Sequence, residues 1–154
     1  CQGTCTLDLT DSGGSNEGDG TIMDVGGNWT MSGTLTAYTN STVFMNSTAA
    51  TNAHETIITN GQTFYNFECK NAGTSNDDCI ISGNLIVAGN LTLTDGALDI
   101  DTNDPNVNVA KNVSIASAGS VMKGTGTWTF DGTTAATYTD STGTPQNIGT
   151  VVFN

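Results

Sequence analysis

Apolar residues occur along this chain in pairs whose two members are separated by one residue. These pairs recur about every 22 residues, a period typical of a solenoid. Because side chains alternate between the two sides of a β-strand, each pair points to one side, and a regular return places like residues above one another. We predict a right-handed parallel β-helix of about seven rungs, a single domain over residues 1–154, with these successive pairs: Met23/Val25, Val43/Met45, Tyr65/Phe67, Leu85/Val87, Val107/Val109, Trp128/Phe130 and Val151/Phe153.

The interior of a rung follows the same interval, which implies three strands per rung. Two sets of apolar residues show it: Leu91/Leu93 with Val113/Ile115, and Leu98/Ile100 with the looser counterpart Val121. Asparagines agree with this register, because the same interval separates Asn84 from Asn106 and Asn90 from Asn112. Stacked asparagine side chains hydrogen-bond along ladders of strands. The Gly-Asn-Leu units at 83–85 and 89–91 are therefore predicted corners of one rung.

The composition favours an all-β fold. Threonine (28), glycine (19) and asparagine (17) are abundant, whereas lysine and arginine total 3. Threonine suits a pleated surface, and glycine and asparagine suit turns, so amphipathic helices are not expected. The alternative within this class is an antiparallel β-sandwich with turns every eight to twelve residues.

The formal net charge of −12 sets aside nucleic acid and anionic membranes as partners, because both need clustered cations. No apolar stretch is long enough for a membrane-spanning helix, so no membrane span is expected. The acidic surface is consistent with a secreted or cell-surface protein.

Cys1, Cys5, Cys69 and Cys79 form an even set without zinc-ligand spacing. Disulfides in an oxidising, extracellular setting are the better interpretation. A bridge between Cys69 and Cys79, closing the polar 69–79 loop, is the first choice, although other pairings and interchain bonds remain open. Cys1 is alternatively the acylated residue of a bacterial lipoprotein. Residues 1–20 are expected to form an irregular N-terminal segment.

Five Asn-x-Ser/Thr sequons make glycosylation permissible but weakly indicated, because chance alone gives a similar number in a chain so rich in threonine. They begin at Asn28, Asn40, Asn46, Asn90 and Asn112.

Acidic residues near 99–104 are weak candidates for calcium, since Asp99, Asp101 and Asp104 offer hard oxygen ligands within six residues. No other cofactor is expected. Catalysis is not expected either, because the chain has no arginine, scattered lysines and a single histidine, His54. Trp29 and Trp128 share the parity of neighbouring core residues, so we expect them inside and not stacked on sugars.

The last residues, including Val151, Val152 and Phe153, form an apolar strand with no polar cap after it. Solenoid ends expose unpaired backbone groups and are normally capped. The sequence therefore predicts an assembly edge here, with a second copy of the chain as partner.

Several segments resemble the repeats of large prokaryotic cell-surface proteins with right-handed parallel β-helices, of which filamentous haemagglutinin-like adhesins are the best-known relatives. The resemblance covers most of the chain from Gly26 onward and rests on these segments: GNWTMSGTLTAYTNSTVFMNSTAAT, GQTFYNFECKNAG, SGNLIVAGNLTLTDGALDI and GTWTFDGTTAAT. It implies a fold and a surface location, and it carries no catalytic residues. The shortness of this chain and its four cysteines depart from the family pattern.

We therefore expect a non-enzymatic structural subunit of an extracellular archaeal or bacterial filament, sheath or surface coat, which polymerises through its strand edges. The alternative is an adhesin or glycan-binding module of a surface protein, with glycans or other surface proteins as partners.

Overall fold

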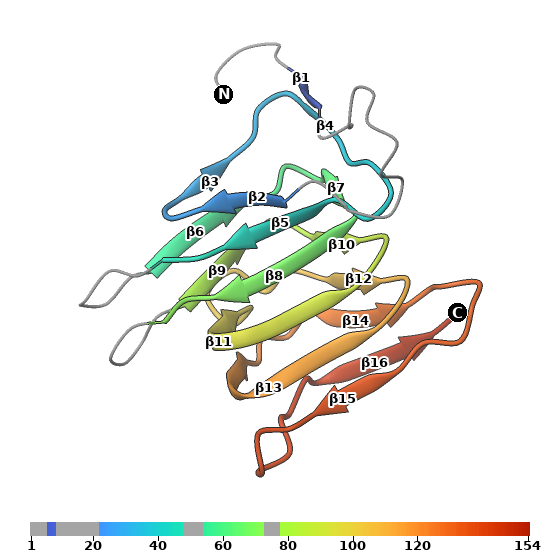
Figure 1. Ribbon diagram of the computed structural model, residues 1–154. Helices are drawn as coiled ribbons and strands as arrows, with labels where there is room; N and C mark the ends of the chain where they lie inside the picture. Colours follow the sequence, from blue (N-terminus) through green and yellow to red (C-terminus); the bar gives the residue numbers. More distant parts are fainter. Residues whose placement is uncertain (1–5, 9–21, 48–53, 73–77) are drawn as a thin grey trace.

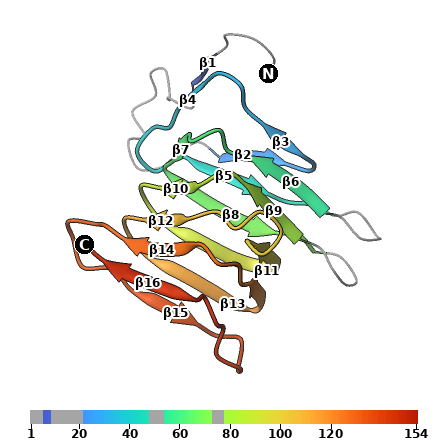
Figure 2. The same cartoon turned by 180° about the vertical axis from the view of Figure 1, so that it is seen from behind.

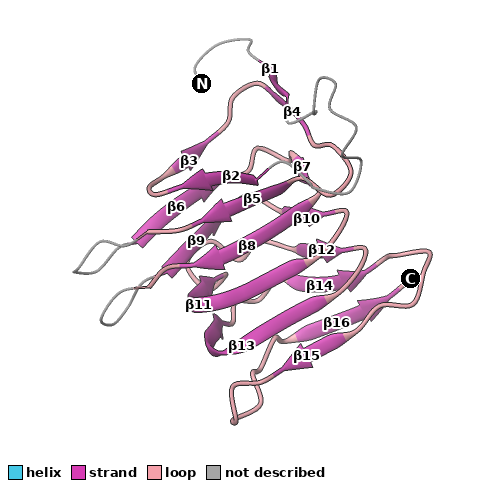
Figure 3. Ribbon diagram, viewed as in Figure 1, coloured by secondary structure: helices cyan, strands magenta, loops and turns pink. Residues whose placement is uncertain are grey.

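The chain forms a parallel β-solenoid in the computed structural model, which describes residues 6–8, 22–47, 54–72 and 78–154 (Figure 1). Strands wind repeatedly through three faces, and all the strand pairs of the described ranges are parallel. These ranges contain no helix (Figure 3). The predicted all-β solenoid is confirmed, and the β-sandwich alternative is wrong because a sandwich requires antiparallel neighbours.

The first face begins each rung. Its strands β7, β10, β12, β14 and β16 form one continuous sheet, and β1 pairs with β4 above it (Figure 2). The strands of this face are β1 (Thr6–Asp8), β4 (Thr34–Thr36), β7 (Thr63–Phe64), β10 (Leu85–Val87), β12 (Val107–Val109), β14 (Thr127–Phe130) and β16 (Thr150–Phe153).

The second and third faces are joined by two long strands that run across both, β11 (Leu91–Asp99) and β13 (Val113–Met122). Their register shifts near the bend, between Leu93 and Asp95 of β11. The second face also contains β2 (Ile22–Val25), β5 (Thr42–Met45), β8 (Asn66–Lys70) and β15 (Tyr138–Asp140). The third face also contains β3 (Trp29–Thr30), β6 (His54–Ile58) and β9 (Asp78–Ser82).

Five rungs of the described chain have strands on all three faces, and β14, β15 and β16 add partial rungs. The seven predicted levels are thus present only on the first face. Within the segment expected to be irregular, Thr6–Asp8 form β1, and the remainder of 1–20 lies outside the described residues.

The register agrees with the predicted period between residues 83 and 130. Leu85 pairs with Val107, Leu91 with Val113, and Leu98 with Val121. Elsewhere the number of residues between stacked positions is not uniform. It is smaller from Met23 to Val43 and larger from Val113 to Tyr138.

Two steps of the predicted ladder are wrong, and the first is the step from Val43/Met45 to Tyr65/Phe67, because Val43 pairs with Phe67 and Met45 with Cys69. Val43 stacks on Phe67, and Phe67 stacks on Leu91, all on the second face, whereas Val87 stacks on Phe64 on the first face. The second wrong step, from Tyr65/Phe67 to Leu85/Val87, therefore crossed from one face to another. The cause is local, because the single residue Tyr65 separates β7 from β8 and makes an unusually short corner.

The interior is filled by columns of apolar side chains, one per rung, that run the length of the solenoid. On the first face one column ends in Phe130 and Phe153, and on the second face another contains Leu93 and Ile115. Trp29 and Trp128 are buried in this core, as predicted. Burial of such columns is the main stabilising term, at about 25 cal/mol per Å² of apolar surface.

Candidate functional site

The C-terminal end of the solenoid presents two unpaired strand edges. Among the described residues, β16 pairs only with β14, and β15 pairs only with β13. On the opposite edge of each strand, the backbone N–H and C=O groups have no neighbouring strand in the described ranges. Such a row is a template on which another strand can pair.

The three residues of the predicted assembly edge lie on β16 and differ in exposure. Val151 packs against the core, Val152 points outward and is 39% exposed, and Phe153 is 79% exposed. Phe153 occupies an interior column, and its ring stacks on that of Phe130 with 5.3 Å between centroids. It is exposed because no further described residue covers it in that column.

A groove of about 190 Å³ opens beside this strand, at the corner between the first and second faces. Tyr138 of β15, 40% exposed, lies on one side and Phe153 on the other. The complete lining is Phe130, Gly132, Thr134, Ala136, Thr137, Tyr138, Phe153 and Asn154. The groove lies where the next strand of the second face would begin.

The third face is closed at this end by a polar turn, which the sequence interpretation missed. The carboxylate of Asp140 accepts hydrogen bonds from the N–H and hydroxyl of Thr142 and from the N–H of Gln146 at 2.6 Å. The side-chain oxygen of Gln146 then accepts the N–H of Val121 on β13 at 3.1 Å. On the third face this turn thus occupies the backbone N–H of Val121, whereas β15 and β16 present strand edges on the other two faces.

The N-terminal end also presents an edge. Strand β2 pairs with β5 and, within the described residues, with no other strand. Ile22 at its start is 67% exposed, while Met23 and Val25 are partly buried against the core. In the described part of the chain, both ends of the second face are therefore free to pair.

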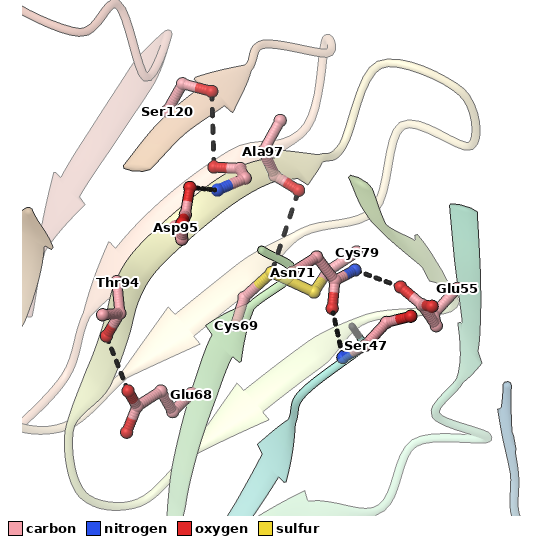
Figure 4. The surroundings of a disulfide bond; sticks show 11 residues. Ser47, Glu55, Glu68, Cys69, Asn71, Cys79, Thr94, Asp95, Ala97 and Ser120 are labelled. Atoms are coloured by element: carbon pink, nitrogen blue, oxygen red, sulfur yellow. Dashed lines mark hydrogen bonds between the residues drawn. A yellow bond between two sulfur atoms is a disulfide. The ribbon is translucent and has the colours of Figure 1, made fainter. Parts of the chain in front are cut away.

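The disulfide between Cys69 and Cys79 is present, as predicted, and both residues are fully buried (Figure 4). It joins β8 on the second face to β9 on the third face within one rung. Beside it, Asn71 accepts the N–H of Ser47 at 3.2 Å and donates to the carboxylate of Glu55. Cys1 and Cys5 lie outside the described residues.

Four of the five sequon asparagines are engaged in contacts between rungs. Asn28 accepts the N–H of Thr56, and Asn46 donates to Asp24. Asn90 accepts from Asn112 at 3.3 Å. Asn112 in turn accepts from Thr137. Asn40, the fifth, is exposed in a turn and has a positive φ of 68°.

The calcium candidates serve as hydrogen-bond acceptors. Asp99 is buried and accepts the N–H groups of Asp101 and Thr102, which builds the turn after β11. Asp104 accepts the N–H of Thr125 from the next rung at 2.6 Å. Among the described residues, no three acidic, histidine or cysteine side chains group as metal ligands would.

The basic residues are dispersed over the strands and corners of the solenoid. His54 pairs with Asp78 at 3.0 Å. Lys70 lies over the ring of Phe44, and Lys111 donates to the hydroxyl of Tyr65. The fold does not bring these side chains together.

Sequence reasoning missed Tyr138, which stacks on Val113 in the same column. The long loop before β15 shifts Tyr138 away from the regular step of the ladder. The contact of Gln146 with β13 could not be predicted from the sequence either. It depends on the shape of the turn that holds the Gln146 side chain.

Comparison with known protein families, with curated proteins and with solved structures found no match. No helix capable of crossing a membrane occurs in the described ranges.

Proposed function

We propose that this protein is a non-enzymatic structural subunit of an extracellular prokaryotic filament, sheath or surface coat, and that it polymerises through its strand edges. The observation that carries the proposal is the free edge of β15 and β16 in the described chain, with Phe153 exposed at the end of an interior column.

The physical basis is that a solenoid stacks like residues at every level. A strand that pairs with β16 satisfies its free backbone groups and covers Phe153 in a single step. Contact between the two different ends of a solenoid is heterologous, so it propagates as a fibre unless it closes into a ring.

An internal disulfide and asparagine bonds between rungs suit a protein that must persist outside the cell. The acidic surface supports the same role, since it keeps free subunits soluble before assembly.

Electron microscopy and sedimentation of the purified chain at neutral pH test this function. We expect regular fibres, tubes or sheets, and we expect Phe153→Asp to reduce assembly strongly, because it places a charge in the contact. Met122→Asp is the matched control, since Met122 is an exposed apolar residue at the end of β13 on the third face, away from β15 and β16.

A discrete monomer at high concentration would contradict the proposal. If that monomer instead gave clear hits on a glycan array, the adhesin or glycan-binding function would replace it.

A further inference from the structure

The two ends of the solenoid are offset by one strand, and this offset constrains how two copies meet. At the C-terminal end, β16 on the first face lies one level beyond β15 on the second face. At the N-terminal end, β1 on the first face precedes β2 in the same rung. A flush stack would therefore place β16 of one copy and β1 of the next at the same level.

Only one of these two strands can occupy that level. If β2 of the next copy pairs with β15, then the position beside β4 of the next copy must be taken either by its own β1 or by the incoming β16. If β1 instead stacks on β16, the second face lacks one strand between β15 and the next β2. That gap would leave both edges unpaired beside the groove at Tyr138.

We propose that copies join head to tail by strand exchange, in which β16 of one copy replaces β1 beside β4 of the next, and β15 pairs with β2 of that copy. This inference rests on the proposed function and adds the partner and the geometry of the contact.

Strand content favours the exchange. β1 is held to β4 by three residue pairs, Thr6 with Thr34, Leu7 with Leu35 and Asp8 with Thr36. β16 has four residues, of which Val151, Val152 and Phe153 are apolar. The incoming strand therefore offers more apolar residues than the strand that it replaces, for the same three residues of β4.

The columns of the second face continue across the same contact. Met23 begins the column that passes through Val43 and Phe67 and ends at Tyr138. Pairing of β2 with β15 therefore brings Met23 over Tyr138, a thioether against an aromatic ring, which is a favourable contact. It also covers Ile22, which is highly exposed in the single chain.

Two substitutions with opposite expected effects test the exchange. Leu7→Pro removes a backbone N–H from β1 and weakens its pairing with β4, so this variant should assemble with a shorter lag than the unmodified chain. Val151→Pro removes a backbone N–H from the free edge of β16, because Asn154, and by alternation Val152, donate to β14 while Val151 faces away from it, so this variant should abolish fibres. The readouts are turbidity and electron microscopy.

A second variant of β1 guards against misfolding caused by proline. The triple change Thr6→Gly, Leu7→Ser and Asp8→Gly weakens the strand without a ring, and it should shorten the lag as well. Circular dichroism below the assembly concentration checks that each variant keeps its β-structure.

The outcomes separate the inference from the function. If the unmodified chain assembles and both β1 variants slow it, then β1 stacks on β16 and the exchange is wrong while the function stands. If the unmodified chain and every variant remain monomeric, the proposed function itself fails.

Discussion

The side-chain oxygen of Asn90 accepts hydrogen bonds from both the backbone N–H and the side-chain amide of Asn112, at 3.3 Å and 3.2 Å. The backbone N–H of Asn90 in turn donates to Asn66 at 2.9 Å. This ladder ends at Thr137, whose N–H and hydroxyl donate to Asn112. At the corner between the first and second faces, asparagine thus supplies the acceptors that the bent backbone does not.

Replacing Asn90 by alanine should destabilise the fold by about 1 kcal/mol, because the N–H of Asn112 loses its acceptor. Asn108→Ala is the matched control, since Asn108 lies on β12 and its side chain makes no hydrogen bond to the described residues. Urea unfolding of both variants measures the difference. Equal losses would show that the asparagine ladder does not hold the corner.

Tight corners should make some glycines irreplaceable. A Cβ atom on Gly132 would clash with the carbonyl group of Ala110 in the rung before. Gly132→Ala should therefore lower the free energy of unfolding by about 1–3 kcal/mol. Gly27→Ala is the control, because no described atom lies within 4 Å of its added Cβ. Thermal unfolding should rank the two variants clearly, and a tolerated Gly132→Ala would contradict the described stacking.

The sequence was most informative where the period was most regular. Leu85, Leu91 and their counterparts one period later could be placed in register, since hydrophobic columns and asparagine ladders both follow the chain at fixed spacing. The same reasoning failed at Tyr65, because a one-residue corner makes two different faces look like one continuing ladder. Simple periodicity does not reveal which face a pair of apolar residues occupies.

The candidate site was only partly predictable for a related reason. The residues of β16 were found from their apolar pattern, whereas the closure of the third face was not. Asp140 and Gln146 act through a turn whose shape depends on several hydrogen bonds at once. The pattern of residue types around them does not differ from that of other acidic loops in this chain.

Stability of the cap should depend on pH in a defined direction. Hydrogen bonds from the Thr142 side chain, and then from the Gln146 and Thr142 backbone, hold the pKa of Asp140 below its ordinary value of 3.8. Because the folded pKa is the lower one, the stabilisation is complete above the unfolded value and disappears as the pH falls through the folded value. Asp140→Asn should lower the melting temperature near neutral pH and have a shrinking effect below about pH 4.

Asp131→Asn provides the comparison for this titration, since Asp131 is exposed on the preceding loop and its side chain makes no hydrogen bond to the described residues. Melting curves of the three proteins between acidic and neutral pH give the measurement. A constant difference between Asp140→Asn and the unmodified chain across that range would argue against the proposed role of the carboxylate.

The disulfide should contribute through the unfolded chain. Cys69 and Cys79 are 10 residues apart, so the bridge closes a short loop, and the chain-entropy treatment gives about 3 kcal/mol of stabilisation. The double variant Cys69→Ala/Cys79→Ala should lose that amount of unfolding free energy and somewhat more. The addition arises because the two sulfur atoms occupy the interior between Met45 in one rung and Leu93 and Leu98 in the next, and their removal leaves a cavity.

Reduction of the unmodified chain separates these two contributions, since it breaks the bond but keeps the sulfur atoms in place. We expect the reduced chain to lie between the oxidised chain and the double alanine variant in urea unfolding. Because both cysteines are fully buried, thiol reagents should label them after reduction only when the protein is unfolded. Rapid labelling under native conditions would mean that the corner between β8 and β9 opens locally, and the bridge would then constrain the folded state and not only the unfolded one.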